Sequence, residues 1–324
     1  MTAASLPDPG ALIAQGAGVL WAIGNTPLVD ASMLLDPETK PAGVRLLVKL
    51  ESSNPSGSTT DRTALTMLRQ ALELGRLSPG QRILEPSSGN TGISLAMLGR
   101  VLGHPVRIVM PENVTKEHST LLRLFGAEVV HSPAELGSSG AVHTAQQLAS
   151  EDRSLFLPMQ YENPANPRAH YDGTGREILA QVEGKLGAFI AALGTGGTLM
   201  GVGRRLREQH PDVAVIAAEL KQRDGAHERF RSSVLDATQL DRRILATNAN
   251  TVACMRDLAK AGIFAGVSTA VALHAARRVA PQMEEGSAIV MIAADGGWRY
   301  LSAGLWDDRT SEQLDADMEA GHWW

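Results

Sequence analysis

The chain has 324 residues, 44% hydrophobic and 20% charged, which is enough for one large or two ordinary domains with a buried core. Its net charge of −5 argues against a nucleic-acid partner. No apolar run is long enough to cross a membrane, and the nine histidines lack the paired spacing of a metal site. The single cysteine, Cys254, excludes a disulfide within one chain, is expected to be a buried inert thiol, and makes the cytoplasm the expected compartment.

Short apolar runs alternate with stretches of helical periodicity in the first half of the chain. After a Gly-Asn-Thr-Pro turn at 24–27, residues 46–50 predict a strand, and apolar residues at helical spacing from Asp61 onward predict a helix. Further strands are expected at 82–84, 106–110 and 127–130, and further helices at 93–102, 121–125 and 141–149. This alternation predicts a parallel sheet covered on both faces by helices.

A second series of alternations begins near Ala188. Strands are expected at 188–193, 213–219 and 288–293, helices at 199–206, 252–261 and 270–279, and an irregular polar segment at 221–241. The two series meet around residues 160–170 and predict an α/β protein of two lobes with a cleft between them. The smaller lobe is expected at 54–162, the larger combines 1–53 with 163–306, and 307–324 form an acidic tail ending in Trp323 and Trp324.

Residues 54–62 read Asn-Pro-Ser-Gly-Ser-Thr-Thr-Asp-Arg and stand between a predicted strand and a predicted helix. The first four favour a turn, and Asp61 in the first helical turn suits the helix dipole. Thr60 is therefore expected to cap the helix. In open α/β sheets, ligands bind where a strand leads into a helix, so this segment is a candidate site.

A second candidate site is the Gly-Thr-Gly-Gly-Thr loop at 194–198, again between a strand and a helix. Glycines let the backbone approach an anion, and free N–H groups with the helix dipole hold it, so a phosphate is expected here. The loop is not a Walker A sequence and does not match Gly-x-Gly-x-x-Gly. Glu219 ends the next strand, where a Rossmann fold would hold a ribose, and this leaves a nicotinamide-dinucleotide-binding enzyme as an alternative.

A third loop, Ser-Ser-Gly-Asn-Thr at 87–91, offers hydroxyls, an amide and N–H groups at a helix start, which suit a carboxylate. The same residues are equally typical of an ordinary helix N-cap without a ligand. Ser268 can likewise be the N-cap of the helix that follows it. Lys221 reads equally well as a solvated surface lysine.

These motifs together resemble the cysteine synthase family, pyridoxal-phosphate enzymes of fold type II with a tryptophan synthase β-like architecture. The likeness runs from Gly24 to Leu305. It implies a transferase or lyase of amino-acid biosynthesis that performs β-replacement on an activated serine, O-phosphoserine or O-acetylserine, with a sulfur or other nucleophile. The family is usually dimeric and acts on small amino acids.

The resemblance also implies roles for individual residues. Ser268 would bond the pyridine nitrogen of the cofactor, and Asn90 its ring hydroxyl. The cofactor phosphate would lie on the loop at 194–198 and the substrate on the loop at 87–91. Gln160 would also contact the substrate. The phosphate residues would be Gly194, Thr195, Gly196, Gly197 and Thr198, and the substrate residues Ser87, Ser88, Gly89 and Thr91.

Residues 294–302 and the aromatic C-terminus are most similar to the branch of the family that uses O-phosphoserine and a thiocarboxylated sulfur-carrier protein. In that branch the C-terminal segment reaches into the active site. Lys221 stands where the branch has an arginine that reads the substrate phosphate. A lysine can bind phosphate as a point charge, but not through a bidentate fork.

One position departs from the family in a way that affects the chemistry. Thr60 occupies the place of the lysine that forms the Schiff base with the cofactor and then moves the substrate α-proton. A threonine hydroxyl forms no stable imine and is a poor base near neutral pH, so normal catalysis is not expected and any bound pyridoxal phosphate would be held without a covalent link.

Three interpretations of Thr60 remain open. It is a lysine-to-threonine change introduced to trap a bound state, a natural divergence with altered chemistry, or the mark of a non-catalytic relative that serves as a binding or regulatory partner. Thr59 also departs from the apolar residue of the family, which a single designed change does not explain, so natural divergence is favoured.

Overall fold

The structure is a computed structural model that describes residues 18–221, 230 and 232–307. Several sequence predictions fall outside these residues. They are the start of the N-terminal arm, part of the polar segment at 221–241, and the acidic tail with Trp323 and Trp324 beyond Asp307.

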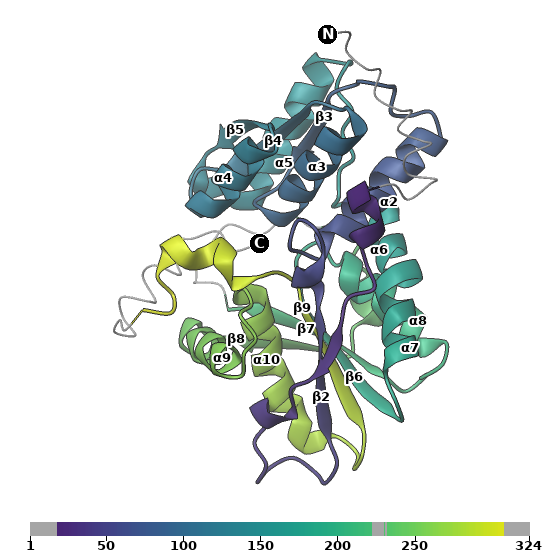
Figure 1. Ribbon diagram of the computed structural model, residues 1–324, viewed down its shortest axis with the longest axis vertical. Coiled ribbons are helices and arrows are strands. Elements are labelled where there is room, and N and C mark those ends of the chain that lie inside the picture. The colour runs from purple at the N-terminus through teal and green to yellow at the C-terminus, as the bar shows by residue number, and fades with distance from the viewer. Residues whose placement is uncertain (1–17, 222–229, 231, 308–324) are drawn as a thin grey trace.

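The smaller sheet has three parallel strands in the order β3-β4-β5 (Figure 1). Successive residues of a strand point to opposite faces, which explains why its apolar runs are continuous. Ile83 and Ile108 pack with α2, α3 and α4 on one face, while Leu84 and Val109 pack with α5 on the other. The strands are Ile83–Pro86 (β3), Val106–Pro111 (β4) and Glu128–Ser132 (β5), and the helices are Thr60–Glu73 (α2), Asn90–Leu102 (α3), Lys116–Leu124 (α4) and Gly137–Glu151 (α5).

The larger sheet has six strands in the order β1-β2-β9-β6-β7-β8. Val48, Ile190 and Met291 pack against α9 and α10 on one face, and Phe189 and Val290 pack against α8 on the other. The strands are Leu28–Asp30 (β1), Arg45–Leu50 (β2), Leu186–Ala192 (β6), Ala214–Leu220 (β7), Arg242–Ala246 (β8) and Ala288–Ala293 (β9). The helices are Ala165–Ala169 (α6), Arg176–Gln181 (α7), Gly197–Arg207 (α8), Asn248–Lys260 (α9) and Val267–Val279 (α10).

Two features of the larger sheet differ from the sequence predictions. Strand β1 pairs antiparallel with β2, so the sheet is mixed at that edge. Strand β8 was not expected, because Arg242 and Arg243 interrupt its apolar pattern. An edge strand needs little burial, and charged residues there block unwanted pairing, so the strand forms where periodicity gave no signal.

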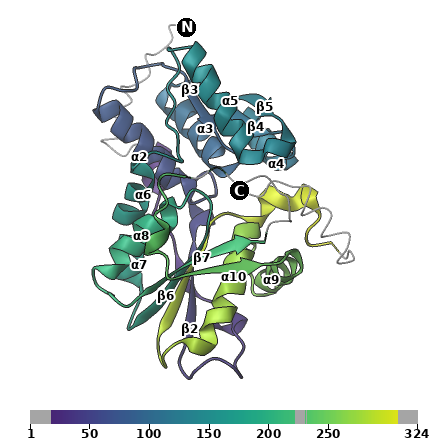
Figure 2. The ribbon, with the colours of Figure 1, turned by 180° about the vertical axis from the view of Figure 1, so that it is seen from behind.

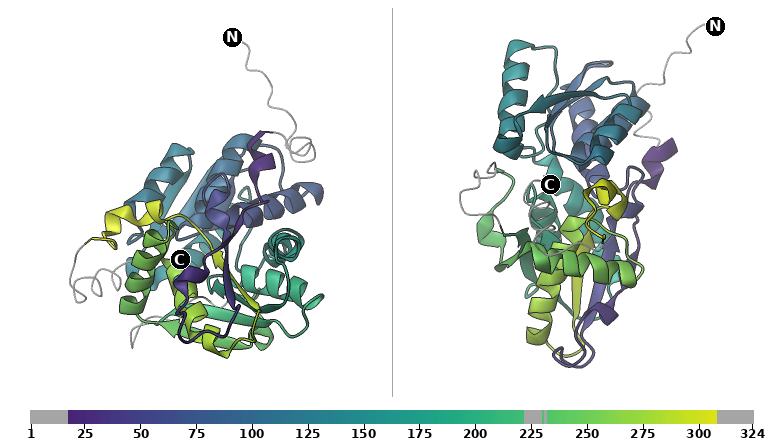
Figure 3. Two further views of the ribbon diagram at one scale, coloured as in Figure 1. Left: turned by 60° about the horizontal axis from the view of Figure 1, so that its bottom comes forward. Right: turned by 90° about the vertical axis from the view of Figure 1, so that its left-hand side faces the viewer.

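Helix α2 links the two sheets, since it follows the β2 segment and packs against both α3 and α6. Seen from behind and from the side, the smaller sheet with its helices sits at one end of the larger one (Figures 2 and 3). The 3₁₀ helix Gly297–Ala303 (η8) lies beside α4, so the end of the described chain returns to the smaller sheet. The residue limits of the two lobes stay a prediction.

Candidate active site

A cavity lies between the two sheets, and its space, open mouth included, measures about 1100 Å³. The loops after β3, β6 and β9 reach it, as expected for the carboxyl ends of parallel strands. The predicted site residues that line it are Thr60, Ser87, Ser88, Gly89, Asn90, Thr91, Gln160, Gly194, Thr195, Gly196, Thr198 and Ser268.

Thr60 lines the cavity, but its hydroxyl is engaged within the protein. Thr60 Oγ1 lies 2.7 Å from Ser58 Oγ and 2.9 Å from Ser94 Oγ. Ser94 donates in turn to Asp61. Burial raises the pKa of Asp61, against hydrogen bonds from Ser56 and Ser94.

The expectation that Thr60 caps α2 was wrong. The helix begins at Thr60 itself, Thr59 is its N-cap, and neither side chain makes the capping bond. Ser268 is not a cap either, because α10 begins one residue earlier and Gly266 precedes it. The Ser268 side chain therefore has no capping role, whereas the Thr60 hydroxyl is held by Ser58 and Ser94.

None of the chain's six lysines lines the cavity. Lys49, the nearest in sequence to position 60, is fully buried, and its ammonium group is bound 2.8 Å from Glu177 and 2.7 Å from the carbonyl oxygen of Thr26. Burial lowers the pKa of Lys49, against the raising effect of Glu177. The remaining lysines are Lys40, Lys116, Lys185, Lys221 and Lys260.

The 194–198 loop has the form of an anion cradle. Gly196 has φ +90°, a conformation that favours glycine, and a Cβ on Gly197 would lie 2.0 Å from Asn166 Oδ1. Asn166 Nδ2 donates to Thr195 Oγ1 at 2.9 Å and so fixes the loop. In the described part of the chain, the N–H groups of Thr195, Gly196 and Thr198 have no backbone acceptor. Such groups at the start of α8 suit a phosphate.

The 87–91 loop is held from two sides. Ser87 Oγ accepts hydrogen bonds from the N–H groups of Gly89 and Gly92, so it organises the start of α3. Thr91 Oγ1 donates to Gln160 Oε1 at 2.6 Å. The structure thus brings Gln160 against this loop although the two are far apart in sequence.

Asn90 reaches across the cavity to the segment after β9. Its Nδ2 donates to Asp295 at 2.8 Å, and its Oδ1 accepts from Arg299, which is fully buried. Asn90 is therefore held by the larger sheet although it belongs to the helix α3 of the smaller one.

Two predicted residues are not among those that line the cavity. Gly197 is buried in the first turn of α8 behind the loop, and Lys221 is exposed at the end of β7. Their roles toward phosphate and substrate stay predictions. Glu219, on which the nicotinamide alternative rested, accepts two hydrogen bonds from Arg243, so its carboxylate is already occupied.

Thr59 and His118 are among the cavity-lining residues that sequence reasoning missed. Thr59 is 7% exposed, and its hydroxyl has no hydrogen-bond partner in the described part of the chain. His118 lies on α4 between residues that are half-buried or exposed, and no local motif marks it. Only the packing of α4 against η8 turns it inward.

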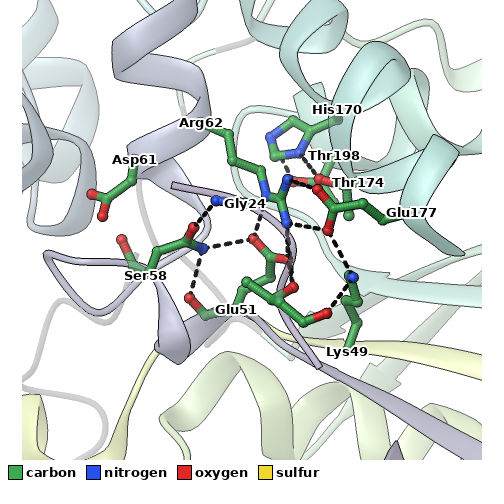
Figure 4. A network of polar contacts seen from close by, with 12 residues as sticks. Gly24, Lys49, Glu51, Ser58, Asp61, Arg62, His170, Thr174, Glu177 and Thr198 are labelled. Atoms are coloured by element: carbon green, nitrogen blue, oxygen red, sulfur yellow. Dashed lines mark hydrogen bonds and ion pairs between the residues drawn. The ribbon is translucent and has the colours of Figure 1, made fainter. Parts of the chain in front are cut away.

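Beside the cavity a buried network of charges joins α2 to the larger sheet (Figure 4). Arg62 on α2 binds Glu51 through Nε at 2.8 Å and Glu177 through Nη1 at 2.6 Å. Glu177 also binds Lys49, so two acids and two bases neutralise one another. Although burial opposes it, hydrogen bonds from Arg62 and Lys49 lower the pKa of Glu177 to about 2.

Among the described residues, no group of three or more histidine, cysteine, aspartate or glutamate side chains is placed to hold a metal ion. No helix in the same part of the chain is both long and apolar enough to pass through a lipid bilayer.

Comparison with known proteins agrees with this fold. Residues 19–295 match the family model described as pyridoxal-phosphate dependent enzyme. Cysteine synthase of Aquifex aeolicus is 38% identical over 305 residues, which cover 90% of this chain and 92% of that protein.

Two solved structures are also similar. The O-ureido-L-serine-bound form of a lysine-to-alanine mutant of O-ureido-L-serine synthase has a TM-score of 0.83 at 35% identity, covering 93% of this chain and 96% of that one. The O-acetylserine-dependent cystathionine β-synthase of Helicobacter pylori has a TM-score of 0.83 at 31% identity, covering 90% and 98%.

The chain therefore belongs to the cysteine synthase family of pyridoxal-phosphate-dependent enzymes, with the fold type II architecture. The predictions of family, fold class and family cofactor are confirmed.

Proposed function

We propose that this chain is a cysteine synthase-like protein that binds pyridoxal phosphate without a covalent link and takes a small activated-serine-type amino acid in the same cavity. Membership of the family supports the scaffold for β-replacement. The observation that carries the non-covalent part is that none of the six lysines lines the cavity. The family resemblance, which puts Thr60 in the place of the Schiff-base lysine, supports the same proposal.

The described residues fit a non-covalent cofactor. Within the described residues, the N–H groups of Thr195, Gly196 and Thr198 lack backbone partners, which suits the phosphate, and nothing lies within 4 Å of a Cβ built on Gly194, so the cradle has room. The buried hydroxyl of Thr59 has no partner in the part of the chain that the structure describes, which is the condition expected of a group that a ligand satisfies. The same residues do not fit covalent attachment.

When bound, pyridoxal phosphate supplies an electron sink next to the amino-acid carbon. The chain's own residues supply binding and orientation. The 194–198 loop would hold the phosphate, Asn90 and Ser268 would contact the ring, and the 87–91 loop with Gln160 would hold the amino-acid carboxylate. Thr60 provides a fixed hydroxyl and no base, so β-replacement is expected to be altered or much slower than in a lysine-containing relative.

The Thr60→Lys substitution tests this proposal directly. Wild-type protein is expected to bind pyridoxal phosphate in equilibrium dialysis and to lose all of it on unfolding, even after borohydride. Thr60→Lys is expected to keep one cofactor covalently after the same treatment, measured as an added mass on the peptide that carries residue 60.

The matched control is Glu73→Lys, which places the same amine on an exposed part of the same helix. It should acquire no covalent cofactor. Borohydride-dependent labelling of wild-type protein at any native lysine would overturn the non-covalent proposal, and absence of labelling in Thr60→Lys would show that the pocket is not intact.

Activity assays on the wild-type and Thr60→Lys proteins distinguish a catalytic protein from a non-catalytic one. A non-catalytic binding or regulatory homologue would bind an amino acid but turn over neither O-phosphoserine nor O-acetylserine, with or without the lysine. We further propose a cytoplasmic homodimer. On the similarity to the O-phosphoserine branch we also propose a sulfur-carrier protein as a partner, which is tested by adding a thiocarboxylated carrier to Thr60→Lys protein.

A further inference from the structure

His118 lies inside the cavity against the 87–91 loop. Its side chain is 3% exposed, yet it is one of the lining residues. A Cβ built on Gly89 would lie 2.7 Å from both Cδ2 and Nε2 of His118, so the imidazole edge rests directly on the glycine backbone. The ring therefore adjoins the loop proposed above for the amino-acid carboxylate.

The hydrogen bonds around His118 fix which ring nitrogen carries the proton. Thr115 Oγ1 donates its hydrogen to the carbonyl oxygen of Arg299 at 2.8 Å. The same oxygen lies 2.5 Å from His118 Nδ1. A hydroxyl has one hydrogen to donate, so here it must accept, and Nδ1 must carry the proton. In the neutral ring, Nε2 then keeps its lone pair, with no protein hydrogen bond to it in the described part of the chain.

The surroundings keep the ring neutral and in place. Burial, aided by the positive charge of Arg299, lowers the pKa of His118 to about 3. The ring of Tyr300 meets that of His118 edge to face, with centroids 5.6 Å apart. Arg299 and Tyr300 belong to η8, so the orientation of His118 depends on the contact between α4 and η8.

Among the cavity-lining residues in the described part of the chain, His118 has the only basic side chain; the other polar ones carry hydroxyls or amides. We propose that His118 is a specificity-determining residue, whose Nε2 accepts a hydrogen bond from an N–H or O–H donor of an amino-acid ligand lying on the 87–91 loop. This inference rests on the proposed function for the position of the ligand. The site then favours ligands that present a donor at this point over those that present only acceptors.

Two substitutions of His118 distinguish the role of Nε2 as an acceptor from the role of Nδ1, which holds the ring against Thr115. His118→Asn keeps an amide near the place of Nδ1, where it can bond Thr115, but leaves no group at Nε2. His118→Gln can place its amide oxygen near Nε2. With L-serine as the probe in calorimetry, His118→Asn is expected to bind about tenfold more weakly than wild type, and His118→Gln within about threefold of it.

A second readout uses wild-type protein and needs no substitution. The ¹⁵N chemical shifts of labelled His118 are expected to show the Nδ1–H tautomer in the free protein, with a change at Nε2 when L-serine is added. An Nε2–H tautomer, an Nε2 shift that L-serine leaves unchanged, or equal affinity of His118→Asn and wild type would overturn the inference. If His118→Asn does not fold, as judged by thermal unfolding, the ¹⁵N measurement decides.

The outcome is separable from that of the proposed function. Absence of pyridoxal phosphate binding in a protein that still binds L-serine through His118 counts against the proposed function alone. Cofactor binding without any L-serine effect at His118 counts against this inference alone.

Discussion

At residue 60 the sequence supplies a hydroxyl in a position where the family resemblance places an amine. The structure shows this hydroxyl bonded between Ser58 and Ser94, with Asp61 behind them. A lysine side chain is longer than this pocket of serines and would extend into the cavity.

The single cysteine gives a prediction at the same scale. Cys254 is 3% exposed on α9, and burial raises the pKa of its thiol to about 11. Because the thiolate is the reactive form, native protein is expected to react with a thiol reagent such as dithionitrobenzoate at least 100-fold more slowly than a free cysteine at pH 8.

The control for Cys254 is the same protein unfolded in guanidinium chloride, which should release one equivalent of chromophore at once. Labelling of native protein at the rate of the unfolded control would show that α9 opens readily, and would contradict the buried packing.

Among the elements, the start of α8 shows how a helix is fitted to a glycine-rich loop. Two glycines of the 194–198 loop have different surroundings. A Cβ on Gly197 would lie 2.0 Å from Asn166 Oδ1, whereas a Cβ on Gly194 meets nothing within 4 Å. Asn166 also donates to the carbonyl oxygen of Gln160, so displacing it disturbs both loops of the cavity.

This difference predicts opposite results for the same substitution. Gly197→Ala is expected to lower the free energy of unfolding by about 1–3 kcal/mol. The reason is that the overpacking destabilises the protein by more than the higher helix propensity of alanine stabilises it. Gly194→Ala is expected to keep wild-type stability and to weaken pyridoxal phosphate binding, since its methyl group enters the open cradle.

Urea unfolding and equilibrium dialysis measure the two effects. Equal stability of both variants would show that the position of Asn166 is not fixed as described. Wild-type cofactor affinity in Gly194→Ala would show that the phosphate lies elsewhere.

For the molecule as a whole, the network around Arg62 is what joins α2 to the larger sheet (Figure 4). Lys49, Glu51 and Arg62 come from β2, the segment after it and α2, which follow one another in the chain, whereas Glu177 comes from the distant helix α7. Removal of one acid leaves Lys49 and Arg62 buried with an uncompensated charge. Breaking a buried ion pair from one side costs about 3–5 kcal/mol, far more than loss of a surface pair.

Glu177→Gln is therefore expected to lower the free energy of unfolding by about 3 kcal/mol at neutral pH. Glu73→Gln, which loses only the exposed pair with Arg69 at 3.9 Å, should change it by less than about 1 kcal/mol. Urea unfolding compares the two, and equal effects would contradict the buried character of the network.

The contribution of Glu177 to the free energy of unfolding is expected to depend on pH in one direction. The folded pKa of Glu177, about 2, lies below its ordinary value of 4.5, so its stabilising effect is present above pH 4.5 and is lost as pH falls toward 2. The stability difference between wild type and Glu177→Gln should shrink over that interval. A difference that stays constant between pH 5 and pH 3 would exclude Glu177 as the titrating group.

The sequence by itself determined the alternation of strands and helices, the family and most of the cavity lining, because these depend on local periodicity and contiguous motifs. The segment around Thr60 and the 87–91 and 194–198 loops each lie in one short run of the chain. The sequence did not predict β8, whose exposed edge has no apolar pattern.

Only the tertiary structure decided how these runs meet. It turned His118 toward Gly89 through contacts with η8, occupied Lys49 with Glu177, and left Lys221 outside the cavity lining. Each of these depends on residues separated by tens to hundreds of positions, whose approach is set by packing of the two sheets and not by local pattern. For this reason the difference between Thr60 and the lysine that the family resemblance implies could be read from the chain, whereas the inward orientation of His118 could not.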